Sequence, residues 1–437
     1  MIGARRMAFD AALMTGGRIG FVALWFVGVA LVYRGLGADA GGVAQAGLFA
    51  MCIAVIKVVS GCITDPIDLA LMRRAPALLQ DDPKAAYRLL HTAFGLRLSC
   101  AALVAGALYG FAPEIAVLLF HRAEAAPLLG VVAVAILGDT VFRATLIVLQ
   151  AGERFVAFVA LEGALQVMRF AGVLALWATG TMSVEMAIGC YAAAAVVASV
   201  GGLLLLPRAM LVRFHTGWHE LRELLHYLKW MTPGMVLAAL NERFDVFLVN
   251  AFSGVEAAGL YGAMLILALV PDLIAGCLSA VLQPRIMRLY HGGHYGVAVR
   301  KFLMIAVPVC VLGMLMAIPL AGPVIGLMLG PAYLPGVPAF LWILAGTLFW
   351  LVVTPLPLTL LAVAVPSRIV LVTLFQSTVL LVVGLLLVPS FGLVGMAQTV
   401  FAMRVAVALV VVVAGHRLAA TRPADGGADP LPGRRAA

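Results

Sequence analysis

Charged side chains inside long apolar runs are the residues of this sequence that could do chemistry. Arg18, Lys57 and Arg243 each lie in such a run, and Arg243 belongs to the segment NERFD at 241–245. Lysine and arginine bind phosphate oxygens, and arginine can do so through two parallel hydrogen bonds. We therefore expect these three cations, together with Asn241, to bind an anionic substrate.

Acidic side chains in the same runs offer two other roles. Glu242 and Asp245 flank Arg243 and could neutralise it, which would make Arg243 a structural residue. Asp272, in the next run, is a candidate for a cation or proton site. Because a charge in hydrocarbon is costly, each of these groups should face protein, a partner or a water-filled cavity. We expect Glu242, Asp245 and Asp272 to serve in ion coupling or in ion pairs.

Five further charges in apolar runs have structural explanations. Asp139 and Arg143 are four residues apart on one predicted helix and should form an ion pair. Arg97 lies near the cytoplasmic surface, where a long side chain can extend into water. Glu162 and Arg169 are two turns apart and would pair through a neighbour.

Sequence patterns typical of catalysis are missing. The chain has no P-loop, no H-E-x-x-H and no G-x-S-x-G. The six cysteines are scattered singly through apolar runs, which indicates small core residues. His215, His219 and Glu220 lie on a predicted surface helix, so we expect no metal, no cofactor and no enzymatic activity. Without an ATP site, transport would depend on a gradient or on substrate exchange.

Composition identifies the environment of these residues. Of 437 residues, 64% are hydrophobic and only 11% are charged, and the mean hydropathy is +1.11. A soluble domain is nearer half apolar and a quarter charged. The sequence therefore predicts an all-α integral membrane protein. The net charge of +9 lies mainly in short loops, which is typical of cytoplasmic loops and does not favour nucleic acid.

Twelve apolar runs are long enough to cross a bilayer. The third and ninth are unusually long, and we expect proline to break each of them. The predicted spans are 12–34, 41–63, 92–120, 128–150, 155–179, 184–206, 230–252, 259–282, 302–329, 338–364, 368–388 and 393–416.

The distribution of lysine and arginine predicts the orientation. With both termini inside, cytoplasmic segments hold twenty Lys and Arg residues, whereas the opposite side holds Arg34 and Arg122. This bias predicts a multi-pass protein of the cytoplasmic (inner) membrane with both termini in the cytoplasm. ADA at 38–40 resembles a signal cleavage site, but the internal repeat requires the helix before it, so we expect that helix to remain uncleaved.

An internal repeat divides the chain. A shift of 218 residues places Gly41 on Gly259 and Pro66 on Pro284, and a shift of 210 places 112–120 on 322–330. Six spans per half predict a parallel repeat about a pseudo-twofold axis along the membrane normal.

The repeat predicts two six-helix lobes around a central cavity. We expect lobes at 1–206 and 230–416, an interfacial cytoplasmic helix at 207–229 and a disordered polar tail at 417–437.

Several segments together resemble one family of membrane proteins. The stretch at 229–264, with an early proline, Asp245 and then GLYGA, is similar to the seventh and eighth helices of polysaccharide-exporting flippases. LQPRIMRLY at 282–290 and LGPAYLPGVPAF at 329–340 fit the same pattern. The chain thus resembles the O-antigen or exopolysaccharide branch of the multidrug, oligosaccharidyl-lipid and polysaccharide exporter superfamily.

This resemblance implies a function. The cavity would be walled by helices 1, 2, 7 and 8, and the protein would flip an undecaprenyl-diphosphate-linked oligosaccharide by alternating access. Its partners would be that substrate, membrane lipid and other membrane proteins of polysaccharide assembly. By position in the helices, the resemblance assigns the diphosphate to Arg18, Lys57 and Arg243.

Two other functions are open at this point. A drug or cation antiporter of the same superfamily would need acidic residues to dominate a largely apolar pocket. A membrane glycosyltransferase or polymerase would need a large loop or surface carboxylates. The predicted outer loops are short, and Asp65 and Asp68 are the cytoplasmic acidic residues close enough to act jointly.

Overall fold

The computed structural model describes residues 2–38, 41–206, 217–276, 278–279, 282, 295–356 and 366–420. Within these ranges the chain is helical, with short turns between helices. Residues 207–216 of the expected linker and 421–437 of the expected tail lie outside the described residues. The same holds for most of the motif at 282–290.

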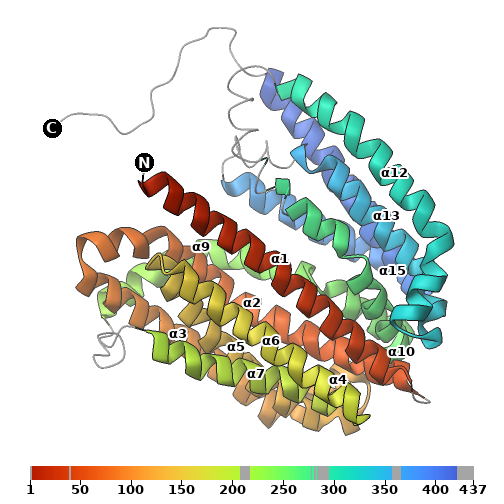
Figure 1. The fold of residues 1–437 in the computed structure, drawn as a ribbon, viewed down its shortest axis with the longest axis horizontal. Coiled ribbons are helices and arrows are strands. Elements are labelled where there is room, and N and C mark those ends of the chain that lie inside the picture. Colours follow the sequence, from red (N-terminus) through yellow and green to blue (C-terminus); the bar gives the residue numbers. More distant parts are fainter. Residues whose placement is uncertain are drawn as a thin grey trace.

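The helices of the first half follow one another with short turns (Figure 1). They are α1 (Ile2–Leu36), α2 (Gly42–Asp81), α3 (Pro83–Gly110), α4 (Ala112–Phe120), η1 (Ala123–Ala125), α5 (Ala126–Ala151), α6 (Phe155–Thr179) and α7 (Val184–Leu205). Helix α3 begins with Asp82, whose side chain accepts hydrogen bonds from the backbone N–H groups of Lys84 and Ala85.

The second half is built from fewer and longer elements. They are α9 (Trp218–Asn241), α10 (Phe244–Leu267), α12 (Tyr295–Met328), η2 (Pro331–Gly336), α13 (Val337–Val353) and α15 (Pro366–Ala420). Helices α10 and α15 each contain a kink at a glycine with positive φ, Gly254 (82°) and Gly392 (56°). In the described residues, ten helices are long and apolar enough to cross a membrane. The kinks divide two of these, and the described parts of the twelve predicted spans fall on the observed helices.

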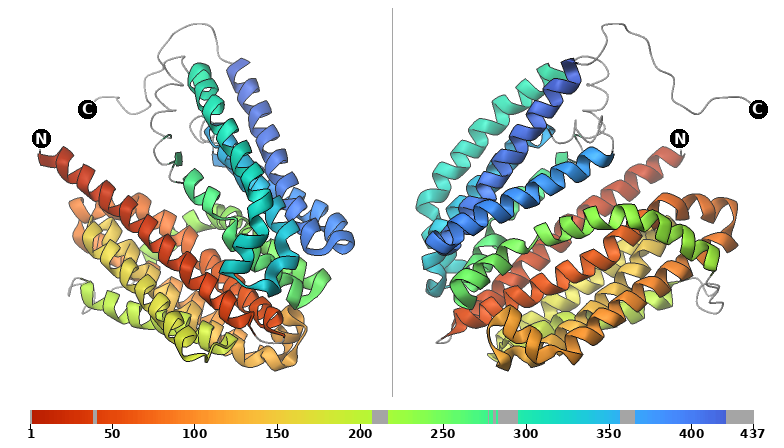
Figure 2. Two further views of the ribbon diagram at one scale, coloured as in Figure 1. Left: turned by 45° about the vertical axis from the view of Figure 1, so that its right-hand side comes forward. Right: turned by 180° about the vertical axis from the view of Figure 1, so that it is seen from behind.

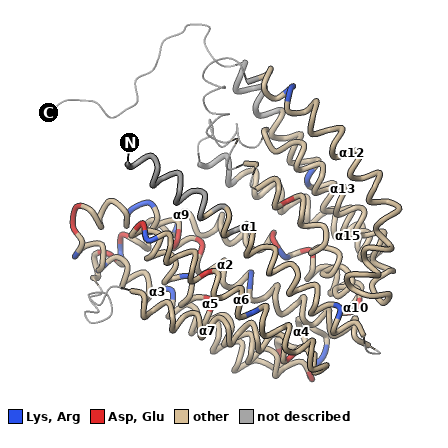
Figure 3. Tube along the Cα trace, in the orientation of Figure 1, with Lys and Arg blue, Asp and Glu red and all other residues tan. Residues whose placement is uncertain are grey.

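The helices form two groups that meet at one end (Figure 2). Helices α1 to α7 make one group, and α12, α13 and α15 make the other. The groups approach each other near α4 and α10 and diverge toward the start of α1. Helix α9 packs against α2, α3 and α15, so it joins the two groups. Helix α12 carries charge only near its start, at Arg300 and Lys301 (Figure 3), and only 6% of its apolar span is buried, as for a helix that faces lipid.

The backbone confirms the repeat and corrects its alignment. Four turns of the first half contain a residue with positive φ, and three of these residues, Gly41, His121 and Gly180, have counterparts among the described residues of the second half. The counterparts of these three are Gly254, Gly330 and Gly392, each roughly 210 residues later, as expected for a parallel repeat. The predicted alignment of 112–120 with 322–330 fits this offset. The 218-residue shift does not, because Gly254 and not Gly259 occupies the turn equivalent to Gly41.

Gly259 has a different role, in the crossing of α2 and α10. A Cβ atom on Gly259 would overlap the carbonyl oxygen of Val43, and a Cβ atom on Gly47 would overlap the carbonyl oxygen of Val255. Val43 and Gly47 are therefore related to Val255 and Gly259 by the repeat. Close backbone contact at small residues is how helices pack tightly in membranes. The halves meet here in a pseudo-symmetric contact.

Proline has different effects in the two long spans. The third span breaks as predicted between Gly110 and Ala112, and Pro113 lies in the first turn of the new helix. The expected break in the ninth span is wrong, because α12 continues through Pro308, Pro319 and Pro323. Local adjustments can re-satisfy the backbone groups that proline frees in a transmembrane helix, so proline alone does not end one.

Candidate substrate-binding site

The seventh and eighth spans are both interrupted. Helix α9 ends at Asn241, Glu242 and Arg243 form a turn, and α10 begins at Phe244. The eighth span is interrupted at 268–269 before helix resumes at 270–276. Non-helical backbone is tolerated at membrane depth where it is buried in protein or lines a water-filled cavity. Both interruptions line the same cavity.

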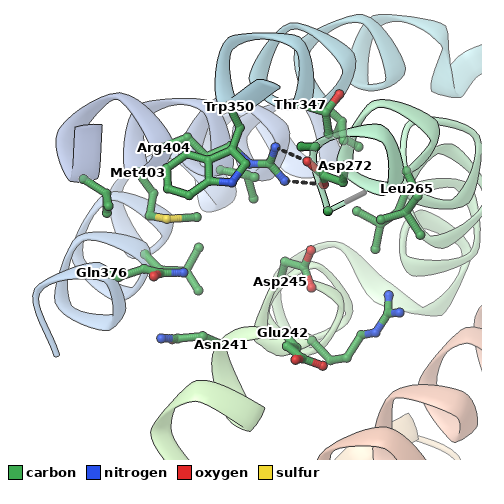
Figure 4. Close-up of a pocket in the computed structure, with 18 of the residues that line it drawn as sticks. Asn241, Glu242, Asp245, Leu265, Asp272, Thr347, Trp350, Gln376, Met403 and Arg404 are labelled. Atoms are coloured by element: carbon green, nitrogen blue, oxygen red, sulfur yellow. Dashed lines mark hydrogen bonds and ion pairs between the residues drawn. The ribbon is translucent and has the colours of Figure 1, made fainter. Parts of the chain in front are cut away.

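This cavity has a volume of about 510 Å³ and belongs mainly to the second half. Asn241, Glu242 and Asp245 reach it from the turn between α9 and α10 (Figure 4). Asp272 lies opposite, and α13 and α15 complete the wall. From those two helices come Thr347, Trp350, Gln376, Met403 and Arg404.

Most of the described intramembrane arginines are paired with carboxylates. Arg404 donates two hydrogen bonds to Asp272, of 2.8 and 2.7 Å. In the first half, Asp139 pairs with Arg143 at 3.0 Å and lies 4.0 Å from Arg169. Paired charges of this kind are neutralised within the protein, so they are poor candidates for binding a substrate.

The predictions for these paired residues have mixed outcomes. The Asp139–Arg143 pair is confirmed. The prediction that Arg97 extends to the surface is wrong, because its side chain is 1% exposed and forms an ion pair with Asp68. A carboxylate on the adjacent helix makes burial of the guanidinium possible.

Lys57 and Arg243 have different surroundings. Among the described residues, neither has an ion-pair or hydrogen-bond partner, so Arg243 does not pair with Glu242 or Asp245. Lys57 is exposed and Arg243 is half-buried. The two cations are close enough to repel each other, and the charges of Arg143 and Arg169 near Lys57 are partly offset by Asp139, the carboxylate that these two arginines share.

Packing of α2 on α9 explains why these cations are neighbours. A Cβ atom on Gly61 of α2 would lie 3.2 Å from the Cβ atom of Ala239 on α9. Lys57 is one turn before Gly61, and Arg243 is one turn after Ala239. Because the two helices run in opposite directions, both cations lie on the same side of this contact. Arg243 also borders a small cavity of about 30 Å³ that Trp25 and Tyr33 of α1 help to line.

The other predicted site residues have definite partners or exposures. The Asn241 amide donates to the Ser377 hydroxyl at 2.7 Å. Asp245 is buried and accepts hydrogen bonds from the Tyr261 hydroxyl, at 2.9 Å, and from the Val246 backbone N–H, at 2.8 Å. Glu242 is exposed and faces the cavity. Arg18 belongs to α1, but its side chain lies outside the described part of the structure.

Several residues of the cavity were not predicted from the sequence. Trp350, Gln376 and Met403 are single residues in apolar runs, where composition does not distinguish a cavity wall from a lipid-facing surface. Arg404 could have been found as a partner for Asp272, since an isolated carboxylate in a span needs one. In the residues that the structure describes, no group of three or more His, Cys, Asp or Glu residues could hold a metal ion.

Comparison with solved structures identifies the fold. The chain is similar to "Lipid II flippase MurJ, inward closed conformation", with a TM-score of 0.72 and 14% identity over 91% of this chain and 87% of that one. It is equally similar to the inward-facing conformation of a multidrug resistance MATE family transporter of the MOP superfamily. That match has a TM-score of 0.72 and 14% identity over 91% and 95% of the two chains.

The outward-facing conformation of such a MATE transporter matches less well. Its TM-score is 0.56, with 16% identity over 92% of this chain and 96% of that one. The divergence of the two helix groups in Figure 2 is therefore nearer to the inward-facing arrangement. These matches show that the chain shares the two-lobed helical fold of these transporters, as the sequence resemblance predicted.

A sequence comparison identifies the family. No curated protein matches the sequence. The model of a family described as "Polysaccharide biosynthesis protein" matches residues 42–338, which include most of the first half, α9, α10 and α12. Because this match covers well over half of the sequence, the chain belongs to that family of polysaccharide biosynthesis proteins.

Proposed function

We propose that this protein flips a polyprenyl-diphosphate-linked oligosaccharide across the cytoplasmic membrane by alternating access, for the synthesis of a surface polysaccharide. Three observations support the proposal: membership of a polysaccharide biosynthesis family, a fold shared with a lipid II flippase, and the chemistry of the site. The site carries the most weight, because family and fold leave the substrate open.

The observation that carries the proposal is the pair of unpaired cations, Lys57 and Arg243, between the two halves. A diphosphate has several anionic oxygens and can bridge two neighbouring cations that would otherwise repel each other. Lys57 lies on α2 of the first half, and Arg243 lies in the turn between α9 and α10 of the second half. A substrate bound to both would couple the two halves.

Alternating access follows from this arrangement. The helix groups diverge toward the start of α1, and the positive-inside bias assigns that end to the cytoplasm. The headgroup would enter from the inner leaflet, with the polyprenyl chain left in lipid. Rocking of the halves about the contact of α2 with α10 would then expose the headgroup on the outer side. Reporter fusions after Pro83 should report inside, and fusions after Arg34 and Gly180 outside.

One observation favours a second function. The cavity of the second half contains three carboxylates, from Glu242, Asp245 and Asp272, and the MATE transporter matches as well as the flippase does. A drug or cation antiporter would use such carboxylates. Asp272, however, is neutralised by Arg404, and Asp245 is buried and accepts a hydrogen bond from Tyr261, so these two carboxylates are less available to a cationic drug.

Transport assays separate the two functions. The full-length protein in proteoliposomes should translocate a fluorescent polyprenyl-diphosphate oligosaccharide, and inorganic pyrophosphate should compete for the site. Lys57→Ala should reduce both transport and competition. Lys301→Ala, at the start of α12 and far from Lys57, is the matched control. Translocation of cationic dyes without translocation of the lipid-linked sugar would contradict the proposal and favour the antiporter.

A further inference from the structure

We propose that the cavity of the second half receives the sugars of the substrate and selects neutral or amino sugars over sugars that carry carboxylates. The inference rests on the proposed function, because it takes the diphosphate to lie between Lys57 and Arg243. It goes further by naming the chemical class of the glycan.

The position of Arg243 determines where the sugars must go. The first sugar is bonded directly to the diphosphate, so it must enter a space that begins at the anion site. Arg243 borders two cavities in the described structure. The one toward Trp25 and Tyr33 is about 30 Å³, roughly the share of one water molecule. The one toward Asp272 is about 510 Å³, within the usual range for a small-molecule site.

The wall of the larger cavity suits a sugar ring. A pyranose has hydroxyl groups around its edge and an apolar C–H face. Gln376 faces the cavity and has no hydrogen-bond partner among the described residues, so its amide is free to donate and to accept. Trp350 and Met403 provide apolar surface beside it (Figure 4). The combination of a few polar groups with apolar surface is typical of sites that orient small ligands.

The charges of the cavity determine which sugars fit. Once Arg243 binds the diphosphate, the cavity keeps Arg404 as its cation, and Arg404 is held by two hydrogen bonds to Asp272. Glu242 is exposed and has no ion-pair partner among the described residues. A uronic acid would place its carboxylate near Glu242 without a cation to bind it. A neutral or amino sugar meets no such repulsion.

Soluble nucleotide sugars test the inference with the full-length protein. UDP-glucose and UDP-glucuronate share the uridine and the diphosphate and differ in the sugar, whereas UDP lacks the sugar and carries one more negative charge on its terminal phosphate. With the protein in nanodiscs, calorimetry should show UDP-glucose binding more tightly than UDP. UDP-glucuronate should bind about tenfold or more weakly than UDP-glucose, because like charges that face each other are strongly disfavoured. Glu242→Gln should reduce the difference in affinity between the two nucleotide sugars. Glu256→Gln, the same change at an exposed position of α10 just after the kink at Gly254, should leave that difference unchanged.

Each outcome separates this inference from the proposed function. If pyrophosphate binds but UDP-glucose binds no more tightly than UDP, the sugars do not occupy this cavity and the inference fails. The inference also fails if UDP-glucose and UDP-glucuronate bind with equal affinity. It fails as well if Glu242→Gln does not change the ratio of their affinities. If neither pyrophosphate nor any of the nucleotides binds, the anion site itself is wrong, and the proposed function fails with the inference.

Discussion

The interior of each half and the interface between the halves differ in whether a cationic side chain has a carboxylate partner. Inside the first half, Arg97 is buried against Asp68, and inside the second half Arg404 is held by Asp272. At the interface, Lys57 and Arg243 have no carboxylate within ion-pair distance in the described structure. If Lys57 and Arg243 bind the substrate as proposed, the position of a carboxylate, and not the presence of a cation, distinguishes a structural charge from a binding site.

The largest effect is expected from breaking an interior pair. Arg97→Ala leaves Asp68 without its cation in a mostly buried position, and breaking a buried pair costs about 3–5 kcal/mol. We expect a clear fall in membrane abundance and in the midpoint of thermal unfolding in detergent. Arg97→Met combined with Asp68→Asn removes both charges and should recover most of the loss. A single variant as stable as the wild type would show that the pair is not structural.

Removing an interface cation should affect transport and not stability. Arg243→Ala should reduce transport roughly ten- to hundredfold, because losing a charge-assisted hydrogen bond in a partly desolvated site costs about 1.5–3 kcal/mol. Arg243→Lys keeps the charge but loses the paired N–H groups, so it should retain part of the activity. Flux is measured in proteoliposomes at equal protein density.

A double variant controls for a structural role of Arg243. Asp245 lies two residues away and is buried, so it could become destabilising once the guanidinium is absent. If Arg243→Ala combined with Asp245→Asn restores transport, Arg243 is a structural residue, and the contrast between interior and interface fails.

The contact between the halves should be sensitive to size rather than to charge. Gly47→Ala adds a methyl group where the carbonyl oxygen of Val255 lies, and overpacking of a tight contact costs typically about 1–3 kcal/mol. We expect altered rates of lobe movement, measured by fluorescence transfer between labels on α3 and α12. Gly106→Ala on α3 adds the same group to open space and is the control. Equal rates for the two variants would exclude a pivot at this crossing.

Much of the fold could be predicted from the sequence, because lipid requires long apolar helices. The twelve spans follow from this requirement, whereas the repeat follows from similar residues that recur about half a chain apart. The breaks at Glu242–Arg243 and 268–269 could not be predicted. The residues that form these turns do not differ in type from residues that continue a helix elsewhere in a span. Lys57 and Arg243 were found because charge is conspicuous in an apolar run. The structural role of Arg97 could not be predicted, because its partner Asp68 lies on a neighbouring helix and the spacing of residues along the chain does not show which helices pack together.

The smallest effect is expected from the ion pairs that attach the start of α9 to the first half in water. Arg88 donates a hydrogen bond to Glu220 at 2.8 Å, and Arg74 donates one to Glu223 at the same distance. The Arg74–Glu223 pair is exposed and the Arg88–Glu220 pair is partly buried. Ion pairs that water reaches contribute about 0–1 kcal/mol and are screened by salt. Glu220→Gln should therefore lower the unfolding midpoint only slightly, and less at high salt than at low salt.

The pH dependence of this small contribution has a definite sign. The hydrogen bond from Arg88 holds the pKa of the Glu220 carboxyl below its usual value. A carboxylate whose folded pKa is lowered contributes stability above its unfolded pKa, near about 4.3, and loses that contribution as the pH falls through the folded value. The difference in melting temperature between wild type and Glu220→Gln should thus be constant from pH 8 to about 5.5 and vanish at lower pH. If Glu220→Gln lowered the melting temperature as much as Arg97→Ala does, water would not weaken these pairs. The difference between interior and surface charges would then depend on something other than burial.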